Sequence, residues 1–99
     1  MATLHLLSHS SFNDSRLASC LRLLGPDDGL LLSGDAVYAL QPGTAQWQAL
    51  ELMPASVALY ALEEDLQARA LAAPDRAQAI DYPAFVELCG RYAKVNSWL

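Results

Sequence analysis

Three short apolar runs, each followed by a helical pattern, constrain the fold of this 99-residue chain more than any other feature. The runs occupy residues 4–7, 30–32 and 57–62. Runs of this length bounded by turn residues are typical of strands buried on both faces of a parallel sheet. Strands that alternate with helices join through crossovers that cover the sheet. The sequence therefore predicts an α/β fold: one three-layer domain over residues 1–99, with a mainly parallel sheet of about four to five strands and helices on both faces.

The first strand–helix unit, residues 3–24, carries the side chain with the most distinctive chemistry. After a polar turn at residues 8–11, residues that suit a buried helix face recur at spacings of three and four. They are Leu17, Cys20, Leu21 and Leu24. Cys20 is therefore expected in mid-helix, on or near the apolar stripe.

Capping residues and acidic residues mark where several of the helices begin. The first helix is predicted to start near Phe12, with Asn13 as its cap or with Ser11 and Asp14 as a capping box. Thr44 is expected to cap a later helix that reaches residue 53. The three acids at 63–65 open another helix, because negative charge is favoured at a helix N-terminus.

The last third of the chain predicts one more helix between two strands. Residues 79–80 are a very short strand candidate, Asp81 caps a helix with Pro83 in its first turn, and residues 95–99 form an edge strand. The buried side of that helix is predicted to hold Phe85, Val86, Leu88, Cys89 and Tyr92. Earlier in the chain, residues 36–40 fit either a short helix or a strand.

The apolar content exceeds what so short a chain can bury. Hydrophobic residues make up 54% of the sequence, against roughly 45–50% in ordinary globular domains, a range that also counts glycine. A chain of this size buries only about two-thirds of its unfolded surface. We therefore expect an exposed apolar patch that another subunit covers.

Charge and motifs exclude several classes of protein. The net charge is −5 and the six basic residues are scattered, whereas nucleic-acid binding needs clustered cations. No apolar run approaches the roughly 20 residues of a membrane span, and the N-terminus lacks the form of a signal peptide. Two cysteines make no disulfide framework, so a cytoplasmic setting is expected. No phosphate-binding, nucleophile-elbow or zinc-protease motif is present, and no cofactor is expected.

Cys20 has two interpretations. Packed under the first helix it is an inert small hydrophobe, and in mid-helix it gains nothing from the N-terminal dipole. Exposed near Arg16, which lies one turn earlier, it is a thiolate able to accept sulfur. Cys89 lies among apolar neighbours and is predicted to be a packed thiol.

The two histidines differ in expected role. A structural zinc site needs four ligands at tight spacings, which His5 and His9 with a cysteine do not provide, so no metal is predicted. His5 is expected to be a hydrogen-bonded core residue. His9 follows the first strand, and with Ser33 and Asp35 it marks the edge of a possible pocket at the carboxyl ends of the strands, where ligands of open α/β sheets gather. This favours a small-ligand-binding module as one alternative.

The acids at 63–65 also allow two interpretations. Glu63, Glu64 and Asp65 form either a carboxylate pair for acid–base chemistry or a solvated helix start. The solvated helix start is the one the sequence favours.

A set of short stretches matches one protein family in order and spacing. The stretches are Leu4-His5, Ser10-Ser11-Phe12, Leu30-Leu31-Leu32, Asp35 with Val37-Tyr38-Ala39, Leu59-Tyr60-Ala61-Leu62, Asp65-Leu66, Ala68-Arg69, Ile80-Asp81-Tyr82, Phe85-Val86 and Trp98. The chain resembles the TusB/DsrH family of sulfur-relay proteins, within the wider DsrE/DsrF-like fold, over nearly its whole length.

The resemblance implies a function within an assembly. Members of the family are cytoplasmic subunits of a heterohexamer with TusC/DsrF-like and TusD/DsrE-like partners, two copies of each. That complex relays persulfide sulfur from a TusA-like carrier towards a TusE-like protein and the 2-thiolation of the tRNA wobble uridine. In sulfur-oxidising relatives the complex handles sulfur for dissimilatory oxidation.

The resemblance also bears on single residues of this chain. The main acceptor cysteine lies on the TusD/DsrE-like subunit, which makes this chain a non-catalytic or weakly thiol-active subunit. Some DsrH-like members carry a cysteine in the first helix, and Cys20 matches that position as a possible persulfide thiol. Relatives tend to have glycine where Ala36 and Ala70 stand here, and alanine is costly where a turn needs a positive φ.

Overall fold

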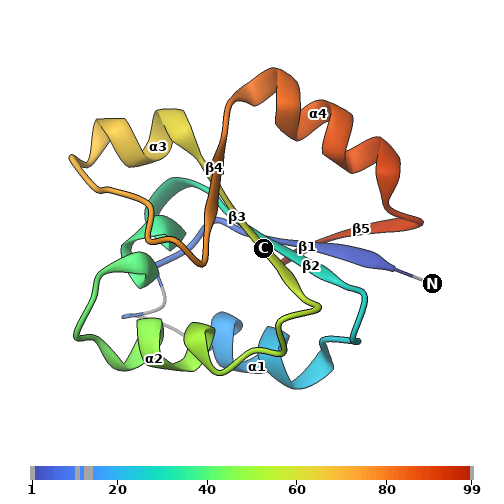
Figure 1. The fold of residues 1–99 in the computed structure, drawn as a ribbon, viewed down its shortest axis with the longest axis horizontal. Helices are drawn as coiled ribbons and strands as arrows, with labels where there is room; N and C mark the ends of the chain where they lie inside the picture. The colour runs from blue at the N-terminus through green and yellow to red at the C-terminus, as the bar shows by residue number, and fades with distance from the viewer. Residues whose placement is uncertain (1, 11, 13–14, 99) are drawn as a thin grey trace.

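Five strands form one all-parallel sheet in the order β4-β3-β2-β1-β5 (Figure 1), in a computed structural model that describes residues 2–10, 12 and 15–98. The strands are β1 (Thr3–Leu7), β2 (Gly29–Leu32), β3 (Ala58–Leu62), β4 (Gln78–Ile80) and β5 (Lys94–Trp98). The predicted α/β class and the parallel sheet are confirmed. The chain runs outward from β1 to β4 and then returns to place β5 on the other side of β1.

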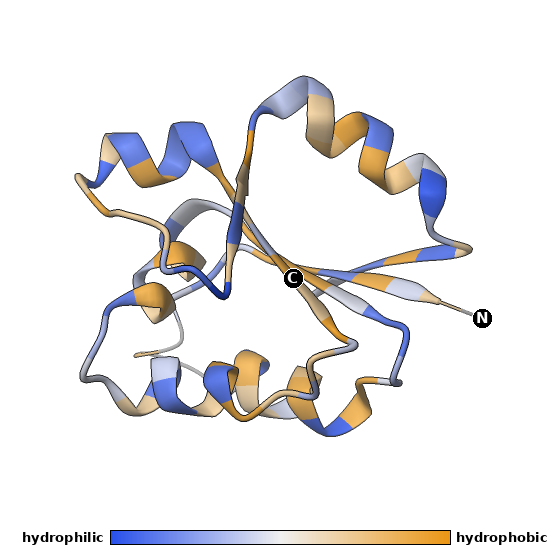
Figure 2. Cartoon of the chain, in the orientation of Figure 1, coloured by the Kyte–Doolittle hydropathy of each residue, from blue (hydrophilic) through white to orange (hydrophobic). Residues whose placement is uncertain are grey.

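Helices cover both faces of the sheet, as the three-layer prediction requires (Figure 1). They are α1 (Arg16–Leu23), the 3₁₀ helix η1 (Gly34–Leu40), α2 (Ala45–Glu51), α3 (Glu63–Ala68) and α4 (Tyr82–Arg91). Figure 2 shows hydrophobic and hydrophilic residues alternating along these helices, whereas the middle of the sheet is mainly hydrophobic. None of the helices formed by the described residues is long and apolar enough to cross a membrane.

The larger core lies between the sheet and the layer that holds α1, η1 and α2. Because successive strand residues point to opposite faces, alternate residues of β1, β2 and β3 contribute to it. Its buried members include Leu7, Leu30, Leu32, Leu59 and Ala61 from the sheet, Leu17 and Cys20 from α1, and Trp47 and Leu50 from α2. Thr44 caps α2 as predicted, since its Oγ1 accepts a hydrogen bond from the Trp47 N–H at 3.1 Å.

The smaller core lies on the other face, under α4. Its buried residues are Leu4, Leu31, Leu62, Ile80 and Leu88. Asp81 caps α4 as predicted, because its carboxylate accepts the Ala84 N–H at 2.9 Å. The prediction that Val86 is buried is wrong: its side chain is 59% exposed, because two residues along a helix turn it almost opposite to Leu88.

Two other sequence expectations are revised by the structure. The first helix begins at Arg16 and not near Phe12, which lies in a turn, while the predicted caps Ser11, Asn13 and Asp14 fall outside the described residues. Residues 36–40, left open between helix and strand, belong to η1.

Candidate functional site

Cys20 is a packed thiol in this structure. Its side chain is completely buried in the larger core, against the face of the sheet that α1 covers. Burial raises the pKa of the Cys20 thiol to about 12, and the negative charge of Asp28 contributes to the rise. At neutral pH Cys20 is therefore protonated and closed to solvent. This geometry favours the packed interpretation over the thiolate interpretation.

Asp28 is the centre of a buried polar cluster at the amino end of β2. Its Oδ1 accepts the Thr3 N–H at 2.9 Å, and its Oδ2 accepts the Gly25 N–H at 2.8 Å and faces Nε2 of His5 at 3.2 Å. Burial raises the pKa of Asp28, but the hydrogen bonds from Gly25, Thr3 and His5 outweigh it and hold that pKa below 3.8. The ionised carboxylate therefore joins the start of β1 to the turn that follows α1.

His5 completes this cluster and is a hydrogen-bonded core residue, as predicted. The indole N–H of Trp98 donates to Nδ1 of His5 at 3.1 Å. An indole nitrogen only donates, so Nδ1 carries no proton and Nε2 donates its proton to Asp28. The chain of hydrogen bonds from Asp28 through His5 to Trp98 fixes the end of β5, an edge strand whose other residues are exposed.

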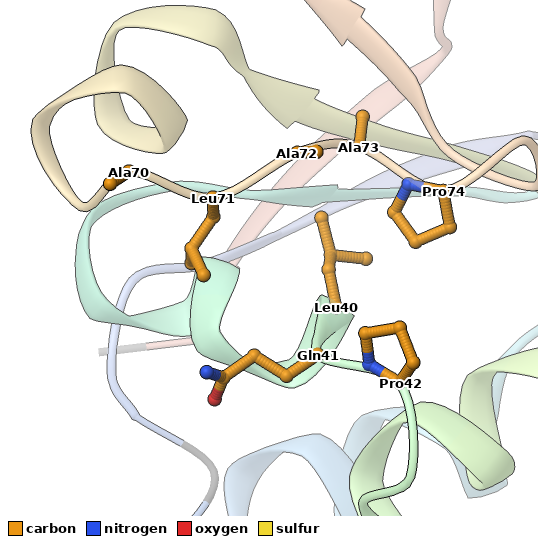
Figure 3. Close-up of a pocket in the computed structure, with 8 residues that line it drawn as sticks. All are labelled: Leu40, Gln41, Pro42, Ala70, Leu71, Ala72, Ala73 and Pro74. Atoms are coloured by element: carbon orange, nitrogen blue, oxygen red, sulfur yellow. The ribbon is translucent and has the colours of Figure 1, made fainter.

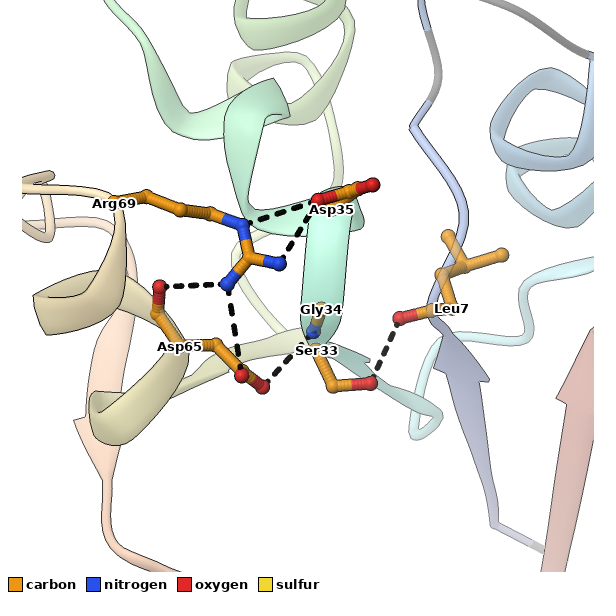
Figure 4. A network of polar contacts seen from close by, with 6 residues as sticks. All are labelled: Leu7, Ser33, Gly34, Asp35, Asp65 and Arg69. Atoms are coloured by element: carbon orange, nitrogen blue, oxygen red, sulfur yellow. Dashed lines mark hydrogen bonds and ion pairs between the residues drawn. The ribbon is translucent and has the colours of Figure 1, made fainter.

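A second polar cluster joins the carboxyl ends of β2 and β3 (Figure 4). Arg69 donates from Nη2 and Nε to Oδ1 of Asp35 at 2.8 and 3.2 Å, and from Nη1 to the main-chain oxygen of Asp65 at 3.1 Å. The hydrogen bond to Asp35 is the main reason that the pKa of Arg69 is raised. Oδ2 of Asp65 accepts the Gly34 N–H at 2.9 Å. The turn into η1 is thereby tied to α3.

This second cluster includes two of the three residues predicted to mark a pocket edge. Asp35 is engaged by Arg69, and Ser33 donates its N–H and its Oγ–H to the main-chain oxygen of Leu7 at 2.9 and 3.3 Å. His9 lies in the loop after β1 with an exposed side chain, and it takes no part in these contacts. Ser33 and Asp35 therefore both belong to this second cluster, a clamp of hydrogen bonds that ties together the ends of β1 and β2 and the helix α3.

A shallow hollow of about 420 Å³ lies beside this clamp, between the end of η1 and the segment that follows α3 (Figure 3). It is lined by Leu40, Gln41, Pro42, Ala70, Leu71, Ala72, Ala73 and Pro74. The lining is mainly apolar, and in the described part of the chain no three His, Cys, Asp or Glu side chains gather to hold a metal ion. The hollow offers shape but no group for acid–base or nucleophilic chemistry.

Sequence reasoning missed three residues that organise these clusters. Asp65 was interpreted as part of a solvated helix start, while Asp28 and Arg69 were given no structural role. Each has a partner 23 to 34 residues away in the chain. The sequence signal that could have found Asp28 is its position. It is an acid directly before the predicted buried strand at 30–32, and the strand before it in the chain holds His5.

Comparison with known proteins agrees with this architecture. A family model described as "DsrH like protein" matches residues 9–95. Protein TusB of Erwinia tasmaniensis is 39% identical over 97 residues, covering 96% of this chain and 99% of the relative, and Protein TusB of Salmonella arizonae is 36% identical over the same shares. The crystal structure of the ychN protein from E. coli superposes with a TM-score of 0.74 at 22% identity, covering 99% of this chain and 100% of that one. The chain belongs to the DsrH-like family, which includes these TusB relatives.

Proposed function

We propose that this chain is an accessory subunit of a sulfur-relay complex that serves tRNA modification. Relatives named TusB, similar over nearly the full length of the chain, support a sulfur-relay role. The partners proposed are TusC/DsrF-like and TusD/DsrE-like subunits in a heterohexamer, with TusA-like and TusE-like proteins as donor and acceptor. In this proposal the complex supplies sulfur for 2-thiolation of the tRNA wobble uridine in the cytoplasm.

The burial of Cys20 is the observation that supports the accessory role most directly. A persulfide carrier needs a thiolate that solvent and a donor protein reach. Cys20 has no exposed surface, and burial holds its thiol pKa at about 12. The persulfide is therefore proposed to reside on a cysteine of the TusD/DsrE-like partner, and this chain supplies surface and support.

Exposed apolar side chains support an assembly. The large hydrophobic residues left exposed in the described structure are Phe12, Leu23, Leu52, Tyr82, Val86 and Val95. They occur in the loop after β1, on α1, near the end of α2, on α4 and on β5, so more than one face is available for partners. This distribution fits a subunit with several neighbours.

Co-expression with TusC-like and TusD-like subunits tests the proposal. The expected result is a complex that co-purifies and that native mass spectrometry resolves as two copies of each subunit. A stable monomer that ignores both partners at micromolar concentration rejects the proposal.

The same complex tests the role assigned to Cys20. After incubation with a persulfide donor, the accessory role predicts no added sulfur on this chain by mass spectrometry. A gain of one sulfur atom that disappears in Cys20→Ser would instead establish a DsrH-like carrier.

A further inference from the structure

The imidazole of His5 lies between two partners that favour opposite protonation states of the ring. His5 belongs to β1 and is only 5% exposed. Its Nε2 faces Oδ2 of Asp28 at 3.2 Å, and its Nδ1 accepts the indole N–H of Trp98 at 3.1 Å. A negative charge beside a histidine favours the protonated ring, whereas an N–H donor at Nδ1 requires the neutral ring. The two contacts therefore cannot both persist when the ring takes up a second proton.

Asp28 keeps its negative charge throughout the pH range in which histidines ordinarily titrate. Burial raises the pKa of Asp28, but the hydrogen bonds that its carboxylate accepts from Gly25, Thr3 and His5 outweigh burial and lower that pKa. The carboxylate is buried, so solvent screens its attraction for a proton on His5 only weakly. Protonation of His5 thus turns the Asp28 contact into a charge-assisted hydrogen bond and strengthens it.

The other titratable and charged side chains on the elements around His5 keep one charge state between pH 5 and 8. Arginine, lysine and aspartate side chains ordinarily stay ionised across this range. The thiol and the phenol of the group stay neutral, because burial raises the pKa of Cys20 and of Tyr92 to about 12. The group comprises Arg16, Arg22 and Cys20 of α1, Asp27 in the turn before β2, Lys94 of β5, and Tyr92 after α4. Histidine is the side chain whose charge ordinarily changes in this range, so His5 is the member of this cluster that responds to pH.

Rotation of a protonated His5 ring cannot restore the bond to Trp98. Both nitrogens of an imidazolium carry a proton, so either one would present an N–H to the N–H of the indole. The centroids of the two rings lie 6.2 Å apart and their planes are tilted by 40°, so the rings are not stacked. With its N–H aimed at His5, the indole presents the positive edge of its ring and not the face that attracts cations. Protonation therefore converts an attractive contact into a repulsive one.

Trp98 is the side chain that anchors the end of β5. This strand lies at the edge of the sheet, pairs with β1 and with no other described strand, and has residues 94–97 exposed (Figure 1). Trp98 alone of its described residues is half-buried, and its ring packs against the larger core. The start of the strand is held separately, by main-chain bonds to the oxygen of Ala2. Loss of the bond to His5 therefore frees the end of β5 while its start stays in place.

We propose that His5 is a pH-sensitive latch on β5: the neutral ring accepts the indole N–H of Trp98 and holds the end of the strand, whereas the protonated ring keeps Asp28 and releases Trp98. The release is local, because Asp28 continues to accept the N–H groups of Thr3 and Gly25 and so keeps β1 joined to the turn before β2. The released state exposes an indole at the sheet edge, beside the carboxyl end of β1. The latch is a property of the chain itself and goes beyond the proposed function.

NMR of the ¹⁵N-labelled full chain between pH 8 and pH 5 tests the latch. The chain has two tryptophans, and Trp47 of α2, which is buried in the larger core, is the internal reference for Trp98. Protonation of His5 is expected to lower the ratio of latched to released Trp98 by about tenfold or more, which moves its indole N–H signal toward the position in the unfolded chain. The Trp47 signal is expected to stay in place. A stationary Trp98 signal, or an equal movement of both signals, overturns the latch.

Two histidine variants locate the response at His5. A glutamine side chain has both an acceptor and donors but takes up no proton in this pH range, so in His5→Gln the Trp98 signal is expected to be independent of pH. His9→Gln is the matched control, because His9 is exposed in the loop after β1, and this variant is expected to respond as the parent chain does. A pH response that survives in His5→Gln, or that disappears in His9→Gln, overturns the assignment.

Asp28→Asn tests the opposing partner and keeps the proposal falsifiable if His5→Gln does not fold. The change removes the charge that favours the protonated ring, so the release of Trp98 is expected to move to lower pH by about 1 unit or more. The unchanged Trp47 signal shows that the variant is folded at the pH of each measurement. Release of Trp98 at the same pH as in the parent chain, or at a higher pH, overturns the latch.

Discussion

Replacing Ala70 with glycine is expected to stabilise the chain. Ala70 follows α3 with a φ of +54°, and it is the one non-glycine residue in the left-handed region among those described. Its N–H donates to the Gln67 oxygen at 3.2 Å, and the Leu71 N–H donates to the Leu66 oxygen at 2.9 Å. This pair of bonds is the Schellman motif, whose left-handed position is normally glycine. These hydrogen bonds therefore hold Ala70 in a left-handed backbone conformation that alanine disfavours.

The magnitude follows from two opposing terms. A non-glycine residue in the left-handed region costs about 1–2 kcal/mol, which glycine avoids. Glycine in turn lowers the free energy of unfolding by about 0.4–1 kcal/mol, because it gives the unfolded chain more conformational freedom. The methyl group of Ala70 is exposed, so little packing is lost. The net gain is about 1 kcal/mol, equivalent to a rise of about 4–8 °C in the melting temperature of a domain of this size.

Urea and thermal unfolding of Ala70→Gly measure this gain. Ala72→Gly is the matched control, because Ala72 is also exposed in the same segment but its φ lies outside the left-handed region. The control is expected to lose about 0.4–1 kcal/mol. If Ala70→Gly is no more stable than the parent chain, or shifts in the same direction as Ala72→Gly, the strain argument is refuted.

Three further experiments test the buried groups. The thiol of Cys20, with its pKa raised to about 12 by burial, is expected to resist iodoacetamide at pH 8 in the folded chain and to react in 6 M guanidinium, which peptide mass spectrometry measures. Asp28→Asn is expected to cost about 1–3 kcal/mol at pH 7. Because hydrogen bonds from Gly25, Thr3 and His5 lower the pKa of Asp28 in the folded chain, its stabilisation is present above the ordinary pKa of an aspartate and is lost as the pH falls through the lowered pKa, so urea titrations of parent and variant should converge in acid. Gly29→Ala is expected to unfold at lower urea than the parent, because the new methyl carbon would lie 2.3 Å from Oη of Tyr92; an unchanged midpoint would contradict the packing described.

The elements that the sequence predicts well are those that depend on local pattern. The runs at 30–32 and 57–62 became central strands, since an apolar run with turn residues on both sides has few other stable placements. The caps at Thr44 and Asp81 were predicted because a capping bond spans only three residues. The start of α1 was misplaced because several residues able to cap a helix precede it, and Ser15, the observed N-cap residue, makes no side-chain capping bond.

The clusters at the two ends of the sheet required the tertiary structure. The partnership of Arg69 with Asp35 depends on the neighbouring positions of β2 and β3, which bring residues 34 apart in the chain to 2.8 Å. Pattern alone also leaves the orientation of an apolar residue open, as the exposed Val86 shows. The family resemblance predicted strain at both Ala36 and Ala70, yet only Ala70 has a positive φ, whereas Ala36 lies in η1 outside the left-handed region.

The polar groups inside this chain are committed to holding its own sheet together. Asp28 is occupied by three donors, His5 uses both ring nitrogens, and Arg69 uses its guanidinium on two acidic residues. A group that must change partners during a reaction cannot also be the fixed partner of a strand or turn without loosening it. The thiol of Cys20 is likewise buried in the larger core, whereas several large apolar side chains of the described residues are exposed. The proposed accessory role fits this division, because the polar clusters hold the sheet together and the exposed apolar side chains are left for neighbouring subunits to cover.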